Sequence, residues 1–392
     1  MKNKTKKWPT FDETFKYIKL SLKLLGLPID KPPNTILFCA LLSIILGVML
    51  GELTFIADQL QKVVNIIQLS YLVPCIGISL LAVVKISYMY FKRDKLQKLI
   101  AEAKKLHTAI EMDPNKVDIA IDDILLVKAV TKYYSIVNVS LTIAYDLNVP
   151  AIILQEYLET NHVRFILKYP VKVPFPVDNW FSWTIVYTHA VMCGFCIIWF
   201  LTTADLLFCN LTCQACVNFA VICNELENLP INDEAAIRET VIRHQNLIKF
   251  SQEIENVFTG PNFVNVCLQS LMICTLGFHM TISKATNIPS LIVFLLSTLL
   301  QIFLMSLYGE KLIYESGRVS HSAFLSKWYK MNEKCKKDIY MIRERAMRPQ
   351  ALTAYKFSVI CYASFVKIIS TAWSYFTILK TVYNPDHQEA AE

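Results

Sequence analysis

The sequence contains few charged residues and very little glycine. Charged side chains make up 18% of the 392 residues, whereas soluble domains carry about 25%. Glycine occurs only 9 times, although its usual share is about 7%. The low charge leaves too few polar side chains to cover a water-facing surface, and the scarcity of glycine excludes most glycine-rich phosphate-binding loops. With 54% hydrophobic residues and a mean hydropathy of +0.39, the chain has the composition of a membrane protein.

Cysteine is absent from residues 132–179, so no disulfide framework is indicated there. Elsewhere, the spacing of Cys193, Cys196, Cys213 and Cys216 is that of a four-thiolate zinc site. No glycine or proline separates the two pairs, so they should lie on one helix, about 30 Å apart. Four zinc ligands must all lie about 2.3 Å from the metal. We therefore interpret these cysteines as small apolar side chains and expect no metal site and no cofactor.

The sequence also lacks any catalytic constellation, so we expect no enzymatic activity. Its first 19 residues have no apolar core, which indicates that no cleavable signal peptide is present. We expect the protein to contact membrane lipid and not to bind nucleic acid.

Seven apolar runs are long enough to cross a bilayer, which takes about 20 residues of helix. The last run, of about 31 residues, would be about 46 Å long as a helix, so its first part should project beyond the hydrocarbon core. The runs predict an all-α membrane protein with spans at about 35–57, 63–90, 133–154, 180–207, 257–282, 288–308 and 352–382.

Lysine and arginine lie mainly on one side of these spans. If the N-terminus is cytoplasmic, the interior segments hold 31 of them and the exterior loops hold 5. The positive-inside rule then predicts a cytoplasmic N-terminus and, after seven crossings, an extracellular C-terminus. The chain divides accordingly into a cytoplasmic segment 1–34, six helices in 35–308, a basic cytoplasmic segment 309–351, a seventh helix 352–383 and an extracellular tail 384–392.

Several ionisable residues fall within the predicted spans, where such residues are rare. Asp205 lies near the cytoplasmic end of the fourth span, and we interpret it as half of a structural pair. Lys85, near the inner end of the second span, can extend its ammonium to the interface. Asp146 either bonds a polar neighbour, which we favour, or contacts a polar group of a ligand. His189 and His279 are expected to pack or to face lipid rather than to form a metal pair.

Two other classes of membrane protein are less favoured alternatives. G-protein-coupled receptors have an exterior N-terminus, and their rhodopsin-like members carry a cysteine at the top of the third span and an Asp-Arg-Tyr after it, which this sequence lacks. Transporters commonly contain internal repeats with interrupted helices. We find no such repeat.

Several short motifs lie in the last third of the chain: Arg345-Ala346, Pro349, Leu352-Thr353-Ala354, Lys356-Phe357 and Ser374 to Lys380. In these motifs the chain resembles insect odorant receptors. Two upstream stretches, Ala204 to Phe208 and Arg243-His244-Gln245, are also similar to that family. Gustatory receptors, a sister group, typically end with Gln-Phe where this chain has Thr381 and Val382, which favours the odorant branch.

The resemblance implies a ligand-gated, non-selective cation channel in the plasma membrane of a sensory neuron dendrite. Four subunits, including a shared co-receptor, would surround one pore lined by the seventh helix of each, and segment 309–351 would form an intracellular anchor. The family co-receptor has a longer connection between the fourth and fifth spans than the one here, about 224–256, so this chain resembles an odour-tuned subunit. Stretches 24–30 and 73–85 resemble moth receptors, including their pheromone-tuned branch. A gustatory-type receptor channel is the nearest alternative.

The outer halves of the second, third, fourth and sixth spans are rich in aromatic and apolar side chains, with a few hydroxyls. Pockets of this composition bind mainly by apolar burial, so the expected ligand is a small, lipophilic, largely neutral volatile. For each residue the alternative is ordinary helix packing or an interfacial aromatic belt. The candidates are Tyr71, Thr142, Tyr145, Trp183, Tyr187, Val191 and Phe294, with Phe278 of the fifth span closing the base.

Alignment with the family's tail also predicts a gate on the seventh helix. Ile378 and Val382 are four residues apart and therefore share one stripe of that helix. If the stripe faces the pore, a narrow ring of such side chains would close it by excluding water. Thr381, beside them, would contact cations in the open state. The alternative is that this stripe faces lipid or another helix.

Overall fold

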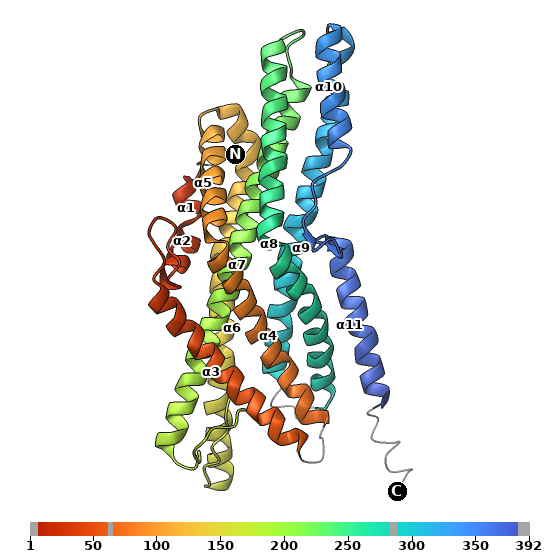
Figure 1. The fold of residues 1–392 in the computed structure, drawn as a ribbon. Helices are drawn as coiled ribbons and strands as arrows, with labels where there is room; N and C mark the ends of the chain where they lie inside the picture. The colour runs from red at the N-terminus through yellow and green to blue at the C-terminus, as the bar shows by residue number, and fades with distance from the viewer. Residues whose placement is uncertain (1–6, 62–65, 283–287, 383–392) are drawn as a thin grey trace, which may run out of the picture.

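The computed structural model describes residues 7–61, 66–282 and 288–382, with the side chains of 66–71 and 382 outside this description. The described part is built from helices and one small hairpin (Figure 1). The elements are α1 (Phe11–Thr14), α2 (Lys16–Leu24), α3 (Thr35–Leu60), α4 (Ile66–Phe91), α5 (Arg93–Glu111), α6 (Pro114–Thr160), α7 (Trp180–Glu227), α8 (Glu234–Ile282), α9 (Ile288–Leu325), the 3₁₀ turn η2 (Trp328–Lys330), α10 (Glu333–Ala346), β1 (Thr353–Ala354), β2 (Ser358–Val359) and α11 (Tyr362–Val382).

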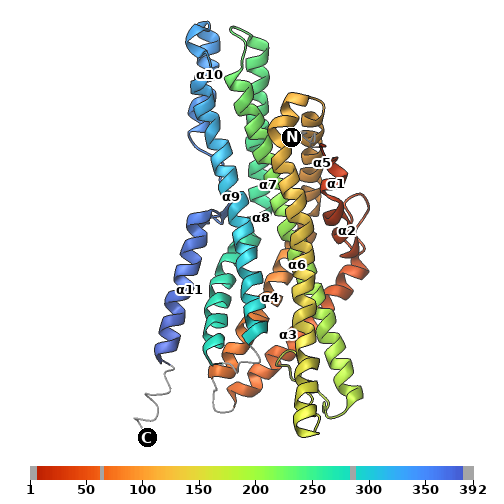
Figure 2. The same ribbon diagram turned by 180° about the vertical axis from the view of Figure 1, so that it is seen from behind.

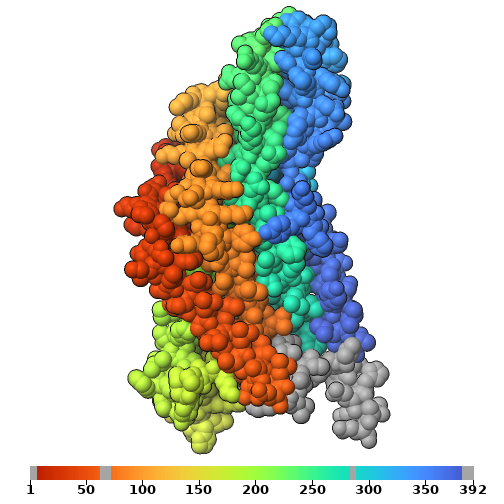
Figure 3. Space-filling view, viewed as in Figure 1, coloured from red at the N-terminus to blue at the C-terminus, as the bar shows by residue number. Residues whose placement is uncertain are grey.

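The long helices lie side by side in one elongated bundle. One end, upper in Figure 1, holds α5, α10 and the connection between α7 and α8, and we call it the α10 end. The other end holds the connection between α6 and α7, residues 161–179, and we call it the loop end. Figure 2 shows α11 alone at one edge of the loop-end half, and Figure 3 shows α3 crossing one face of the same half. The bundle is therefore widest where the apolar segments lie.

Helix α7 forms the centre of the bundle. Every residue from Thr203 to Cys223 is buried, and α7 packs against α9, α6, α8 and α4. It runs without a break from Trp180 to Glu227. This confirms the single helix on which we placed both Cys-x-x-Cys pairs. Because α7 is surrounded by other helices, its cysteines fill space among apolar neighbours.

Polar residues fix where the long helices begin and end. The side chains of Asn34 and Asn179 cap α3 and α7 by accepting from the backbone N–H groups three residues on. Asp113 caps α6, and Pro114 occupies its first position, where no hydrogen bond is lost. Helix α6 stops at Asn161, which adopts the left-handed conformation (φ 57°) common at helix C-termini. The caps at Asn161 and Asn179 therefore set the length of the loop between α6 and α7.

Six helices are long and apolar enough to cross a membrane, counting only the described residues. They contain five of the first six predicted spans in full, and α4 contains the second from residue 66, since residues 63–65 lie outside the described part. Most of these helices extend well beyond the predicted spans. Helix α6 begins at Pro114 rather than near 133, α8 begins at Glu234 rather than near 257, α7 ends at Glu227 rather than near 207, and α9 ends at Leu325 rather than near 308. The extensions carry the polar residues that hydropathy excludes, and they reach the α10 end (Figure 1).

The predicted seventh helix is wrong in its first ten residues. Residues 352–361 form a hairpin, with Thr353 paired to Val359, and α11 begins only at Tyr362. Tyr355 and Lys356 turn the chain with φ of 50° and 60°. The carboxylate of Glu255 accepts hydrogen bonds from the backbone N–H and the hydroxyl of Thr353. Tertiary contacts with α8 therefore override the apolar run, and α11 is 21 residues long.

Candidate functional site

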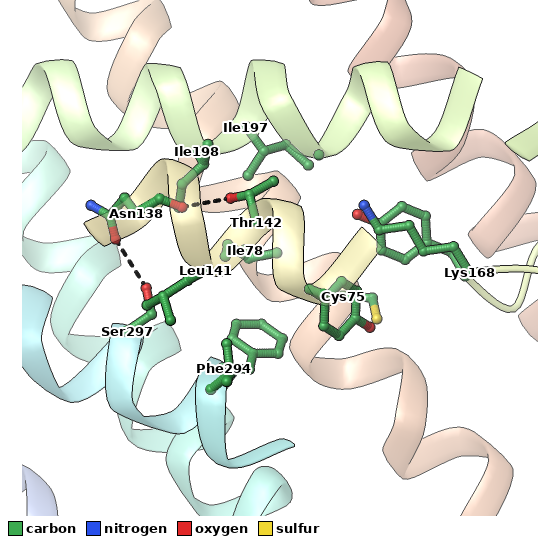
Figure 4. Close-up of a pocket in the computed structure, with 14 residues that line it drawn as sticks. Cys75, Ile78, Asn138, Leu141, Thr142, Lys168, Ile197, Ile198, Phe294 and Ser297 are labelled. Atoms are coloured by element: carbon green, nitrogen blue, oxygen red, sulfur yellow. Dashed lines mark hydrogen bonds between the residues drawn. The ribbon is translucent and has the colours of Figure 1, made fainter. Parts of the chain in front are cut away.

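Two adjoining cavities lie within the loop-end half of the bundle. The inner chamber, of about 90 Å³, is lined by α4, α6, α7, α9 and the 161–179 loop (Figure 4). The outer chamber, of about 550 Å³, lies next to it toward the loop end. Five side chains line both chambers: Cys75, Tyr145, Lys168, Tyr169 and Phe294.

Three of the predicted pocket residues line these chambers. Thr142 lines the inner one, and Tyr145 and Phe294 line both. The hydroxyl of Thr142 donates to the backbone carbonyl of Asn138 at 2.8 Å, so its methyl group is the part left for an apolar ligand. Figure 4 shows Phe294 reaching toward the chamber from α9.

The end of the inner chamber farthest from the loop is closed by a fixed polar contact. The amide nitrogen of Asn138 donates to Thr202 at 3.0 Å, and its amide oxygen accepts from Ser297 at 3.3 Å. These bonds tie α6 to α7 and α9, and Figure 4 shows the bond to Ser297. Because the side chain of Asn138 is already bonded at both ends, it serves as a wall of the chamber rather than as an open hydrogen-bonding group.

Four of the predicted pocket residues line neither chamber. Trp183 and Tyr187 stack on each other, with ring centroids 4.7 Å apart, and they hold the neighbouring backbone. The indole of Trp183 donates to the carbonyl of Ile166 at 2.8 Å, and the Tyr187 hydroxyl donates to the carbonyl of Asp146 at 2.5 Å. Phe278 is buried elsewhere, with its ring 6.2 Å from that of His279, and Val191 is half-buried on α7. The side chain of Tyr71 lies outside the described residues.

The 161–179 loop supplies two chamber residues that we did not predict, Lys168 and Tyr169. Lys168 is only 8% exposed, and its ammonium forms an ion pair with Asp146 of α6. The same ammonium lies 5.4 Å from the ring centre of Tyr145 and 4.9 Å from that of Tyr169. Burial lowers the pKa of Lys168, and the negative charge of Asp146 opposes that shift. The structure confirms the polar-partner interpretation of Asp146.

One sequence signal could have located this loop inside the bundle. Residues 165–171 read Phe-Ile-Leu-Lys-Tyr-Pro-Val, which is unusually apolar for a segment outside the spans. Its ends are fixed to neighbouring elements, since Trp183 binds Ile166 and the backbone N–H of Lys172 donates to the carbonyl of Gly51 at 3.1 Å. Under the positive-inside rule Lys168 is only one of the five charges of the exterior loops.

The two histidines lie in different places. His279 is buried and lines the outer chamber. His189 packs against α3, where an added Cβ on Gly47 would lie 3.3 Å from the imidazole carbon Cε1. Among the described residues, no group of three or more histidine, cysteine or acidic side chains could hold a metal ion.

A polar network lies beyond the inner chamber, toward the α10 end. The ammonium of Lys85 is 2.5 Å from one carboxylate oxygen of Asp205, and the amide of Gln301 donates to the other at 2.7 Å. Gln269 in turn donates to Gln301 at 2.6 Å. The structure confirms a structural pairing for Asp205. The expectation that Lys85 reaches an interface was wrong, because its side chain is 2% exposed and ends on Asp205.

Two of the three predicted gate residues, Ile378 and Thr381, have exposed side chains on α11. Phe376 faces α8, with its ring 3.4 Å from the position of an added Cβ on Gly277. Ile378 is 57% exposed on another side of the helix. Thr381 is exposed, and its hydroxyl donates to the carbonyl of Thr377 at 2.9 Å. The side chain of Val382 lies outside the described residues.

Comparison with known proteins identifies one family. The family model described as "7tm Odorant receptor" matches residues 65–373. Putative odorant receptor 92a of Drosophila melanogaster is 25% identical over 398 residues, covering 95% of this chain and 96% of the relative. The odorant receptor coreceptor of Aedes aegypti is 23% identical over 147 residues, covering 37% of this chain and 31% of the coreceptor. In structure, the chain is similar to the olfactory receptor OR5 of Machilis hrabei in complex with eugenol, with a TM-score of 0.78 at 14% identity over 95% of this chain and 97% of that one.

Proposed function

The chain belongs to the insect odorant receptor family, and from this premise we propose that it is an odour-tuned subunit of a ligand-gated, non-selective cation channel formed with the family co-receptor. The observation that carries the proposal is the pair of chambers lined by α4, α6, α9 and the 161–179 loop, with α7 completing the inner chamber and α3 and α8 completing the outer one. Their lining is mostly apolar and aromatic, which suits a small, lipophilic, largely neutral volatile bound mainly by apolar burial. The Machilis hrabei receptor, which shares this fold, binds eugenol in its complex, and eugenol is a ligand of this kind.

The extent of the similarity supports a tuned subunit rather than a co-receptor. The match to putative odorant receptor 92a spans nearly the whole of both chains, whereas the match to the Aedes aegypti coreceptor covers about a third of each. It also favours the odorant branch over the gustatory, G-protein-coupled and transporter alternatives. The moth-type and pheromone-tuned assignments stay predictions.

The proposed arrangement places the α10 end in the cytoplasm of a sensory neuron dendrite. The excess of lysine and arginine in the segments at that end supports it. Residues 1–34 and 309–351 would then lie inside, and the tail 384–392 outside. Helix α10 packs on α9 and α8 through one face, so its other face is available as an anchor for the remaining three subunits of a tetramer. Helix α11 would be the seventh span and would line the pore.

Co-expression tests the assembly. We expect robust ligand-evoked cation current when this chain is expressed with the co-receptor and exposed to a panel of volatiles, and little current when it is expressed alone. The measurement is whole-cell current at matched surface expression. Equal ligand-evoked current from the chain alone would contradict the need for a co-receptor, and slow uptake without current would favour a transporter.

The gate is proposed on the stripe of α11 that contains Ile378 and Val382, of which Ile378 is exposed. Since Phe376 faces α8 within the same chain, Ile378 is directed away from that contact and toward whatever surrounds the subunit. In a tetramer with α11 at the axis, Ile378 and Val382 would converge with their counterparts and close the path by dewetting. Ligand must then stabilise the wide state more than the narrow one.

Substitution of Ile378 by serine is expected to raise the ligand-independent leak, because a polar ring holds water that an apolar ring expels. Val382→Ser should act in the same direction, and Thr381→Val should alter ion selectivity. The measurement is holding current and reversal potential without ligand. Phe376→Ser is the control on the α8-facing side and should not raise leak. Unchanged leak and selectivity in the Ile378 and Val382 variants at normal surface expression would rule out this stripe.

A further inference from the structure

The ammonium of Lys168 is built into the wall of the chambers. It comes from the 161–179 loop, yet its side chain is only 1% exposed and it lines both chambers. Helix α7 leaves room for it, since an added Cβ on Gly194 would lie 2.6 Å from the ammonium nitrogen. The loop is fixed on both sides, at Ile166 and at Lys172. The position of the charge is therefore set before any ligand arrives.

The hydrogen-bonding capacity of this ammonium is only partly used. An ammonium group has three N–H donors. Asp146 is the carboxylate within ion-pair distance, and the rings of Tyr145 and Tyr169 lie beside the charge. Within the part of the chain that the structure describes, no second oxygen acceptor hydrogen-bonds to it. A hydrocarbon placed against this wall would leave a buried donor unpaired, which is unfavourable.

We propose that Lys168 is the specificity-determining contact of the chambers and that the ligand is a neutral volatile with an acceptor oxygen, such as an aldehyde or an ester. This inference rests on the proposed function and adds the chemical class of the ligand. The acceptor oxygen takes a second N–H of Lys168, while the hydrocarbon part lies against Phe294 and the aromatic wall. Asp146 already neutralises the ammonium. An anionic ligand would therefore add a buried negative charge without a partner, and the site disfavours it.

The test uses four probes that each contain an eight-carbon chain: octane, octanal, octyl acetate and octanoate. Each is applied to the channel formed with the co-receptor, and the readouts are the concentration for half-maximal current and the shift in Tm of the purified complex. A charge-assisted hydrogen bond predicts that octanal and octyl acetate act at roughly ten- to a hundredfold lower concentration than octane. Octanoate should be weaker than either.

The variants separate recognition from folding. Lys168→Met alone leaves Asp146 buried and unpaired, so the informative variant is Lys168→Met with Asp146→Leu, which removes both charges and keeps similar volumes. It should bring the half-maximal concentrations of octane and octanal to within about threefold of each other, which is less than a hydrogen bond to a charged group contributes. Lys168→Arg should retain part of the preference. Lys172→Met is the matched control, because that lysine is on the same loop but is 56% exposed and pairs with Asp58; it should leave the preference unchanged.

The outcomes distinguish this inference from the proposed function. Equal potency of octane and octanal in the unmodified channel would overturn the inference and leave the receptor assignment standing. A preference that survives loss of both charges would also overturn it, since the oxygen would then be recognised elsewhere. If no probe evokes current or shifts the Tm, the chambers do not bind small neutral volatiles, and the proposed function fails as well.

Discussion

Replacing Asp205 with leucine is expected to abolish most of the folded protein, and replacing Asp205 and Lys85 together should restore much of it. The single change leaves the Lys85 ammonium buried without its counter-charge, which destabilises by about 3–5 kcal/mol. Removing both charges with apolar residues of similar volume, as in Lys85→Met with Asp205→Leu, is often nearly neutral. The measurements are surface expression and the Tm of the detergent-solubilised protein.

The size of this effect follows from the position of the pair. Lys85 and Asp205 lie on α4 and α7, and both side chains are almost fully buried. The second oxygen of Asp205 accepts from Gln301 of α9, which in turn accepts from Gln269 of α8. One carboxylate therefore joins a network across four helices in the middle of the bundle. The double variant should stay somewhat below the unmodified protein, because Gln301 loses an acceptor worth about 1–3 kcal/mol.

An exposed ion pair provides the control. Lys128 and Glu13 are 2.7 Å apart, but their side chains are 38% and 51% exposed, so solvent screens their attraction. Glu13→Leu should therefore leave expression and Tm nearly unchanged. An Asp205→Leu variant with normal expression and Tm, or a double variant no more stable than Asp205→Leu alone, would show that burial of this charge does not determine stability.

Hydropathy predicted the apolar parts of the helices well and their ends poorly. The runs at 35–57 and 180–207 lie within α3 and α7, because about 20 apolar residues are what a hydrocarbon core requires. The polar continuations of α6 and α8 are stabilised by packing against other helices at the α10 end. That packing depends on contacts between segments far apart in the sequence. A hydropathy average over neighbouring residues cannot detect such contacts.

The candidate site was predictable in its apolar part and not in its charged part. Tyr145 and Phe294 are aromatic residues in apolar spans, so composition alone selected them. Trp183 and Tyr187 have the same composition signal, but they pack behind the 161–179 loop. Lys168 carries a charge and lies outside the predicted spans, so the positive-inside rule places it among the charges of an exterior loop. Only the fold of the loop into the bundle places it opposite Asp146.

The hairpin before α11 is a second feature that the sequence did not predict. Its two left-handed residues, Tyr355 and Lys356, are not glycines, and left-handed backbone is uncommon for such residues. The backbone N–H of Tyr355 donates to Thr259 of α8 at 2.8 Å, and at the end of the hairpin the backbone N–H of Tyr362 donates to Glu310 of α9 at 3.0 Å. The start of α11 is thereby attached to both α8 and α9.

Substitution of Gly309 by alanine is expected to displace this hairpin and to abolish ligand-evoked current. An added Cβ would lie 2.1 Å from the backbone carbonyl oxygen of Ile360. A backbone oxygen cannot move aside by changing rotamer, and the N–H of Ile360 is itself bonded to the carbonyl of Leu352 at 2.8 Å. Overpacking of this kind destabilises by about 1–3 kcal/mol. The displaced start of α11 would also change its position relative to α9 and hence the pore that we propose it lines. The measurements are Tm and current at matched surface expression.

Gly317 provides the matched control on the same helix. An added Cβ there would meet only the side chain of Pro349, at 3.6 Å, which is an ordinary contact. Gly317→Ala should therefore be neutral or should stabilise α9 by about 0.5–1 kcal/mol through the loss of backbone freedom in the unfolded chain. The two substitutions are identical and lie eight residues apart on one helix. If Gly309→Ala lowers the Tm and Gly317→Ala does not, the loss is caused by the contact with Ile360 rather than by helix propensity. Equal Tm and equal current in the two variants would show that the hairpin can shift without a measurable loss of stability. The position of α11 would then not depend on the hairpin.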